Sequence, residues 1–326
     1  MRELGLSSLI VALSILFAGC EKSAQPVPAD EHKKPVVVFV AFEDDVLLRD
    51  LLDTYSEESG VRVIVRRGIP ENIVSDVIEN KISPPADLLL TGSVSDIWRA
   101  AEEGALRPLR SEVVSKNVPQ WLRDPDDFWV AFSYQTAVLA YDPDVFDKSE
   151  LAGVGSLHES QFREQLCLSS SANPINRAVV AMLIAESGVR DTQTTVRGWL
   201  ENLAQPAFNA DEDLLAAVDA GDCGIGIVSS RVAAKVTSGN PVHRFRIYEH
   251  EVFADIEAVG VVRHAHNPAG ATALVEWLMN RKNQKRYSSK SFLSATSEAA
   301  ETGKNVSLVA RHEEDAIKLA ERVQYR

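Results

Sequence analysis

The sequence predicts an α/β protein made of two α/β lobes that are joined by a hinge, with a ligand cleft between them. Three observations support this prediction. Short apolar runs alternate with amphipathic stretches, a long extended run lies near the middle of the chain, and a late apolar run at 258–262 returns to the first set of strands. Such alternation is typical of largely parallel sheets covered by helices. The length of 326 residues and the ordinary globular composition indicate roughly two domains.

The first lobe begins at residues 36–41 (VVVFVA), a continuous β-branched run typical of a strand buried on both faces. Acidic residues at 43–45 then begin a helix, whose apolar side chains recur at helical spacing until it stops near Gly60. The alternation continues with strands at 61–65 and 87–90 and with helices around 73–78 and 97–104.

Residues 128–141 form a long extended run, which Ser133 and Tyr134 interrupt and which leads to a second α/β set between 167 and 228. A strand at 258–262 and helices at 271–287 and 313–323 complete the chain. We therefore expect the first lobe to contain residues 36–131 and 258–305, and the second to contain residues 132–257 and 306–326.

The N-terminus predicts export and attachment to a membrane. Residues 4–18 are apolar but too few to span a bilayer, which needs about 20, so they fit a signal peptide better. The following LFAGC resembles a bacterial lipobox, which makes residues 1–19 the signal peptide and Cys20 the lipidated residue. The alternative is an ordinary secretory peptide that leaves Cys20 free. Residues 20–35, rich in proline and charge, then form a flexible linker in the periplasm.

Charge and cysteine content exclude several classes of protein. With 34 Lys and Arg against 47 Asp and Glu, the net charge is −13, which excludes a basic nucleic-acid binder. No cysteine and histidine spacing fits a zinc site. Because an exported protein meets an oxidising compartment, we expect Cys167 and Cys223 to form a disulfide between strands. Two buried free thiols are the alternative.

Several segments in a fixed order resemble one known family, the ferric-ion-binding solute receptors of ABC importers. They include ESGVRVIVRRG, SPPADLLLTG, WLRDPDDFWVAFS, LCLSSSANPINRAVVAMLIAESG and AVDAGDCGIGIVSS, and the resemblance covers nearly all of residues 36–326. It implies a type II periplasmic-binding-protein fold and an ABC permease in the inner membrane as partner. It also implies Fe³⁺ as a transported ligand, with no certain cofactor. We expect a monomer, and the absence of catalytic motifs argues against an enzyme.

The resemblance fails at the metal ligands. The family typically holds ferric iron with a histidine, a glutamate and a pair of consecutive tyrosines, and two arginines flank the bound anion. The matching ligand positions here hold Asp44, Gly92, Arg231 and Val232, and the two arginine positions hold Gln135 and Ala137. A guanidinium repels a trivalent cation, so the family's ligand set does not carry over.

The same region instead predicts a site for negative charge. Arg231 follows Ser229 and Ser230, and this combination of a guanidinium and hydroxyls suits a carboxylate, phosphate or phosphonate. Two further sets of side chains precede helices where an anion can bind: Ser170, Ser171 and Asn173 in the second lobe, and Thr91 and Ser93 in the first. Simple helix capping is the alternative for both sets.

Two residues extend this site toward a ligand with charge of both signs. Asp44 can meet an amine, or it can merely stabilise the start of its helix, and Tyr134 can stack on a ligand or pack between the lobes. We therefore expect a binding protein for a small oxyanion or zwitterion. One alternative is iron held by Asp44, Tyr134 or another phenolate with an exogenous chelator. Another is a receptor that no longer transports and serves a signalling partner.

Overall fold

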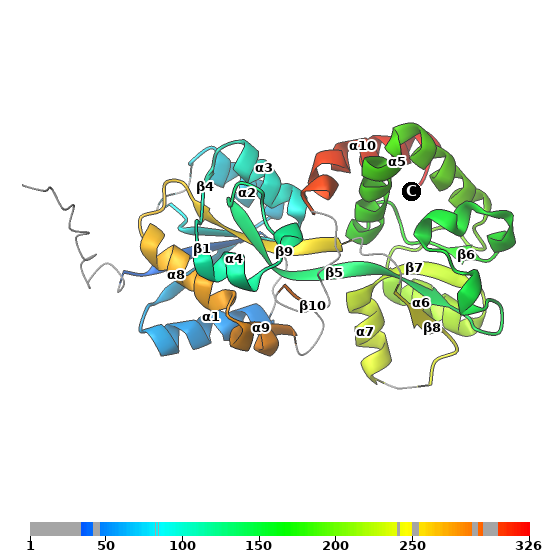
Figure 1. Cartoon of the computed structure of the whole chain (residues 1–326), viewed down its shortest axis with the longest axis horizontal. Helices are drawn as coiled ribbons and strands as arrows, with labels where there is room; N and C mark the ends of the chain where they lie inside the picture. Colours follow the sequence, from blue (N-terminus) through cyan, green and yellow to red (C-terminus); the bar gives the residue numbers. More distant parts are fainter. Residues whose placement is uncertain are drawn as a thin grey trace, which may run out of the picture.

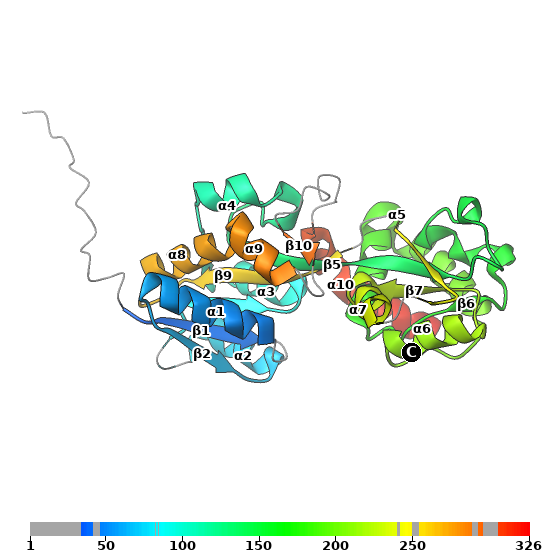
Figure 2. The same cartoon turned by 90° about the horizontal axis from the view of Figure 1, so that it is seen from below.

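The computed structural model describes residues 34–41, 46–81, 83, 85–239, 242–249, 254–288, 293–295 and 306–326. The predicted signal peptide, Cys20 and Asp44 lie outside these residues. Figures 1 and 2 show two groups of helices and strands joined by one long strand, β5, which confirms the predicted fold class. Within the described ranges no helix is both long and apolar enough to cross a membrane.

The strands form one sheet that extends through both lobes. Its order is β2-β1-β3-β9-β5-β7-β6. In addition, β4 pairs with β9, and β8 and β10 each pair with β5. The strands are β1 (Val36–Ala41), β2 (Val63–Arg67), β3 (Leu88–Thr91), β4 (Leu106–Arg107), β5 (Trp129–Tyr141), β6 (Leu166–Cys167), β7 (Ile225–Ser229), β8 (Arg246–Tyr248), β9 (Ala254–Val262) and β10 (Leu293–Ser294).

The helices cover this sheet on both faces. In the first lobe α1 and α9 lie on one side and α2 and α3 on the other, while in the second lobe α5 and α7 lie on opposite sides (Figure 1). The helices are α1 (Val46–Ser59), α2 (Pro70–Ile78), α3 (Val94–Glu102), α4 (Glu112–Asn117), α5 (Pro174–Glu201), α6 (Asp211–Ala220), α7 (Ser230–Gly239), α8 (Pro268–Leu278), α9 (Arg281–Ser288) and α10 (Ser307–Val323). Short 3₁₀ turns occur at 120–122, 148–150, 154–158 and 160–162.

Three elements, β5, β9 and α10, connect the lobes. β9 pairs with β3 in the first lobe and packs against α5 in the second. β5 pairs with β9 over its first part and with β7 and β8 over residues 137–141. α10 packs against α3 in the first lobe and α5 in the second. The predicted interruption at Ser133 is present as a register shift between Ala131 and Ser133, although the strand continues through it. The residue boundaries of the lobes stay a prediction.

The predicted helix at 271–287 is wrong in one respect, because the chain forms two helices there. α8 ends at Leu278, and the side chain of Asn280 accepts a hydrogen bond from the backbone N–H of Lys282 at 2.9 Å, which caps the start of α9. The predicted strand at 61–65 is shifted to 63–67 as β2. Both differences concern the ends of elements and leave their order unchanged.

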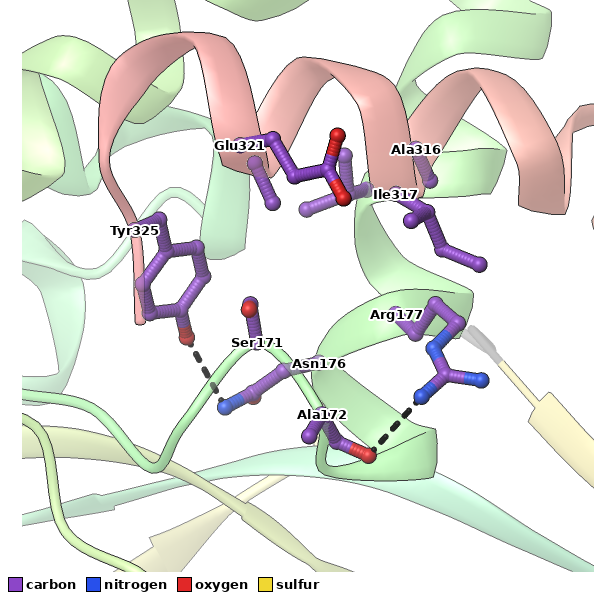
Figure 3. A pocket seen from close by; sticks show the side chains of 10 residues that line it. Ser171, Ala172, Asn176, Arg177, Ala316, Ile317, Glu321 and Tyr325 are labelled. Atoms are coloured by element: carbon purple, nitrogen blue, oxygen red, sulfur yellow. Dashed lines mark hydrogen bonds between the residues drawn. The ribbon is translucent and has the colours of Figure 1, made fainter.

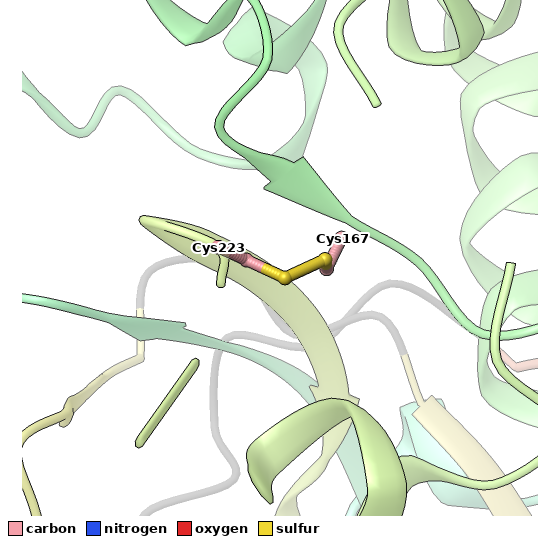
Figure 4. Close-up of a disulfide and its surroundings, with 2 residues drawn as sticks. All are labelled: Cys167 and Cys223. Atoms are coloured by element: carbon pink, nitrogen blue, oxygen red, sulfur yellow. A yellow bond between two sulfur atoms is a disulfide. The ribbon is translucent and has the colours of Figure 1, made fainter. Parts of the chain in front are cut away.

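A disulfide joins Cys167 to Cys223 in the second lobe, with 6.0 Å between the Cα atoms and a sequence separation of 56 (Figure 4). Cys167 ends β6, whereas Cys223 lies in the turn before β7, so the bridge joins a strand to a turn and not two strands. The predicted pairing is therefore present, and it fixes the connection between α6 and β7 beside β6.

Candidate functional site

The junction of β7 and α7 holds Ser229, Ser230 and Arg231 next to β5. The buried Ser229 accepts a hydrogen bond from the backbone N–H of Val232 at 3.2 Å and lies 3.0 Å from Oε1 of Gln135. Ser230 Oγ accepts the backbone N–H of Thr136 at 3.0 Å. The Ser229 hydroxyl therefore caps α7, and both hydroxyls attach this helix to β5.

Arg231 is paired with a protein carboxylate. Its Nη2 lies 3.0 Å from Oε1 of Glu257, whose side chain is only 7% exposed. Ser133 donates its hydroxyl to the other oxygen of Glu257 at 2.5 Å. Glu257 was not predicted from the sequence, and Arg231 was predicted to bind an anionic group of the ligand. The structure instead places an internal counter-charge beside the guanidinium, so this junction is not a simple positive patch.

A second buried carboxylate, Asp255, adds to the negative charge around Arg231. Asp255 and Glu257 are two residues apart on β9, so both side chains lie on the same face of the sheet. Burial, with a smaller contribution from the charge of Glu313, raises the pKa of Asp255 to about 6. Backbone N–H groups, including that of Val94, and the charge of Arg231 act in the opposite direction. A compact ligand that carries negative charge alone would meet repulsion here.

Asp211 brings the two predicted anion-binding segments of the second lobe together. Its Oδ1 accepts hydrogen bonds from Ser169 Oγ at 2.5 Å and Asn173 Nδ2 at 2.8 Å, and its Oδ2 accepts the backbone N–H of Ser229 at 2.7 Å. Burial raises the pKa of Asp211, although hydrogen bonds from Ser169 and Ser229 oppose that shift. Asp211 was not predicted from the sequence, because it is one of three acidic residues in the first turn of α6, where acidic side chains are common.

The loop before α5 shows a helix cap at Asn173 and a local turn at Ser170. Asn173 Oδ1 accepts the backbone N–H of Ile175 at 2.9 Å, with Pro174 at the first helical position. Ser170 Oγ accepts the backbone N–H of Ala172 at 3.2 Å.

Ser171 faces a pocket of about 200 Å³ that lies between α5 and α10, and no residue of the β7–α7 junction lines this pocket (Figure 3). On the wall of this pocket, Tyr325 donates its hydroxyl to the carbonyl of Ser169 at 2.6 Å and accepts from Asn176 Nδ2 at 3.0 Å. The lining residues are Ser171, Ala172, Asn176, Arg177, Val180, Ala316, Ile317, Ala320, Glu321 and Tyr325.

In the first lobe, Thr91 and Ser93 also make local hydrogen bonds. Thr91 is fully buried and donates its hydroxyl to the carbonyl of Ser93 at 2.9 Å, and Ser93 caps α3 by accepting the N–H of Ser95 at 3.2 Å. Tyr134 is 4% exposed and packs edge-to-face on Trp121, with 5.4 Å between the ring centroids. The packing alternative therefore describes Tyr134 in this conformation, and a role for these residues in ligand binding stays a prediction.

No group of three His, Cys, Asp or Glu side chains that is able to hold a metal ion occurs among the residues that the structure describes. A bare ferric ion needs several anionic oxygen ligands. The described His, Cys, Asp and Glu side chains do not supply such a set by themselves.

Residues 50–312 match the family described as bacterial extracellular solute-binding protein. The chain belongs to this family. Since family members bind and deliver solutes, the prediction of a binding protein rather than an enzyme is confirmed. Two relatives are Iron uptake protein A1 of Synechocystis sp., 25% identical over 297 residues, and the Fe(3+)-binding periplasmic protein of Serratia marcescens, 20% identical over 290 residues. Each alignment covers 86% of this chain and 82% of the relative.

Solved structures show the same fold. A Trichodesmium protein, IdiA (FutA), solved in complex with iron and citrate ligands, superimposes with a TM-score of 0.79 at 24% identity, covering 90% of this chain and all of that one. The ferric binding protein of Campylobacter jejuni gives a TM-score of 0.75 at 20% identity, covering 89% of this chain and 100% of the other. These likenesses confirm the predicted type II periplasmic-binding-protein fold.

Proposed function

We propose that this protein captures ferric iron as a small carboxylate chelate, of which ferric citrate is the test case, and delivers it to an ABC permease. The observation that carries the proposal is the Arg231–Glu257 pair, which gives the β7–α7 junction charge of both signs. A chelate presents carboxylates to the guanidinium and a metal centre to the surrounding negative charge. Iron as cargo is also supported by the relatives named for iron uptake and Fe(3+) binding.

The chelate explains how iron can bind where the usual ligands are missing. Ferric iron prefers charged oxygen donors, and a polycarboxylate brings most of them with it. The protein then needs only to bind the outer oxygens of the chelate. Arg231, in the first turn of α7, supplies a guanidinium fork for that purpose.

A zwitterion without metal is the second candidate, because it also carries charge of both signs. About a third of the Arg231 side chain is exposed, which leaves part of it accessible to a ligand. A plain oxyanion is less favoured, since it brings no positive charge to offset Glu257. A receptor that feeds a signalling partner would use the same site without a permease.

The family and the N-terminal sequence support a proposal for the location of the protein. The family is extracellular, and we propose that lipidation of Cys20 holds this member at a membrane as a monomer. The permease partner would then meet the closed form of the two lobes in the periplasm.

Ligand-dependent thermal unfolding of the mature protein tests the proposed function. Ferric citrate at 100 times its dissociation constant should stabilise the folded state by about 2.7 kcal/mol, because it binds only that state. Metal-free citrate, inorganic phosphate and a panel of amino acids serve as comparison ligands and should shift the midpoint far less. If phosphate or an amino acid shifts the midpoint and ferric citrate does not, iron is not the cargo.

A further inference from the structure

We propose that Glu257 determines the ligand specificity of this site, because it holds Arg231 and so excludes plain oxyanions while admitting anions that carry their own positive centre. This inference rests on the proposed function and names the charge type of the ligand. Glu257 acts through Arg231, which makes it a positioning residue for the binding guanidinium.

Two donors hold the carboxylate of Glu257 in place, one at each oxygen. Glu257 lies opposite Ser133 in the β5–β9 pairing, and the Ser133 hydroxyl binds one carboxylate oxygen while Arg231 binds the other. Each donor comes from a different element, β5 or α7. The carboxylate therefore has a defined orientation, and it points one oxygen at the guanidinium.

Burial makes this pair selective. An anion that draws Arg231 away leaves the Glu257 carboxylate, whose side chain is only 7% exposed, with one donor fewer. The anion also brings its own negative charge close to Glu257 and to Asp255, which is on the same face of β9. A ligand with a metal centre or an ammonium group offsets these charges, so it binds Arg231 without that loss.

The substitution Glu257→Gln tests the inference. Glutamine keeps the shape and still accepts the Ser133 hydrogen bond, but it removes the charge that opposes oxyanions. We expect the affinity for metal-free citrate and for inorganic phosphate, measured by titration calorimetry, to rise by about 10- to 100-fold, the range expected for a hydrogen bond between charged groups. The ratio of ferric-citrate to citrate affinity should fall by a similar factor.

Two further variants separate this role from a general effect on folding. The double variant Glu257→Gln with Arg231→Gln should lose the gained citrate affinity, since the gain depends on the released guanidinium. Glu212→Gln is the matched control. It removes the carboxylate of an exposed ion pair with Lys235 of α7, in which the charged atoms are also 3.0 Å apart. This variant should leave the affinity for both ligands unchanged.

The outcomes distinguish the inference from the proposed function. If the protein fails to bind ferric citrate but Glu257→Gln gains oxyanion binding, the cargo is wrong and the role of Glu257 stands. If Glu257→Gln retains its thermal stability and binds citrate and phosphate as weakly as the original protein does, the inference is overturned. A gain that persists in the double variant also overturns it.

Discussion

Because Asp255 is buried, its single carboxyl group makes the stability of the folded protein depend on pH. Its pKa is about 6 in the folded protein against an ordinary value of 3.8, so folding favours the protonated form. The folded state therefore loses stability as the pH rises from about 4 to about 6, and the loss, on the order of 3 kcal/mol, is complete above that range. This pH dependence has the opposite sign to that of a carboxylate in an ion pair, which loses its stabilising effect as the pH falls.

Asp255→Asn removes this dependence. Asparagine keeps an oxygen for the backbone N–H groups but has no proton to release, so the variant should unfold at a higher temperature than the original protein at about pH 8. At about pH 4 the two midpoints should agree. Melting curves at both pH values check this prediction. Equal midpoints at about pH 8 would show that burying the ionised Asp255 carboxylate does not destabilise the folded protein.

The residues of the site were only partly predictable from the sequence. Ser229, Ser230 and Arg231 were recognised because a guanidinium and hydroxyls at the end of a strand are an unusual set. Glu257 was missed because the predicted strand began at residue 258, where the apolar run is uninterrupted. Charged side chains at positions 255 and 257 weaken the apolar signal of β9, although they are buried inside it.

The close packing of β7 against α6 depends on a glycine. A Cβ atom at Gly226 would lie 2.5 Å from Cδ2 of Leu214 and 3.0 Å from the carbonyl oxygen of Cys167. Since the backbone oxygen on β6 cannot move away freely, Gly226→Ala should destabilise the protein by about 1–3 kcal/mol. Gly155→Ala is the matched control, because its Cβ meets nothing within 4 Å. Urea unfolding of both variants checks the prediction, and equal midpoints would contradict it.

The order of the elements was predictable, whereas several of their ends were not. Apolar periodicity placed β1, α1 and β7 close to their observed positions, because it reports which side chains are buried. The division between α8 and α9 depends on one capping side chain, Asn280, which changes the average apolar pattern very little. Local hydrogen bonds of this kind decide where an element stops, and a hydrophobic pattern does not contain them.

The whole molecule should unfold as one unit although it has two lobes. β5, β9 and α10 each contact elements of both lobes, so neither lobe can lose these elements alone. Replacing Cys167 and Cys223 by serine removes a cross-link confined to the second lobe and should lower the free energy of unfolding by roughly 4 kcal/mol. Urea unfolding followed by tryptophan fluorescence and by circular dichroism should still give one coincident transition. Separate transitions for the two probes would contradict the shared unfolding.

The position of β9 between β3 and β5 also affects how the newly made chain matures. On a ribosome the strands β1 to β3 emerge early, but the neighbour that completes their hydrogen bonding is not synthesised until residue 262. Until then β3 presents an open edge, which is a place for wrong pairing with another polypeptide. Keeping the nascent chain apart from its neighbours over that interval is therefore a requirement that this topology imposes on the cell.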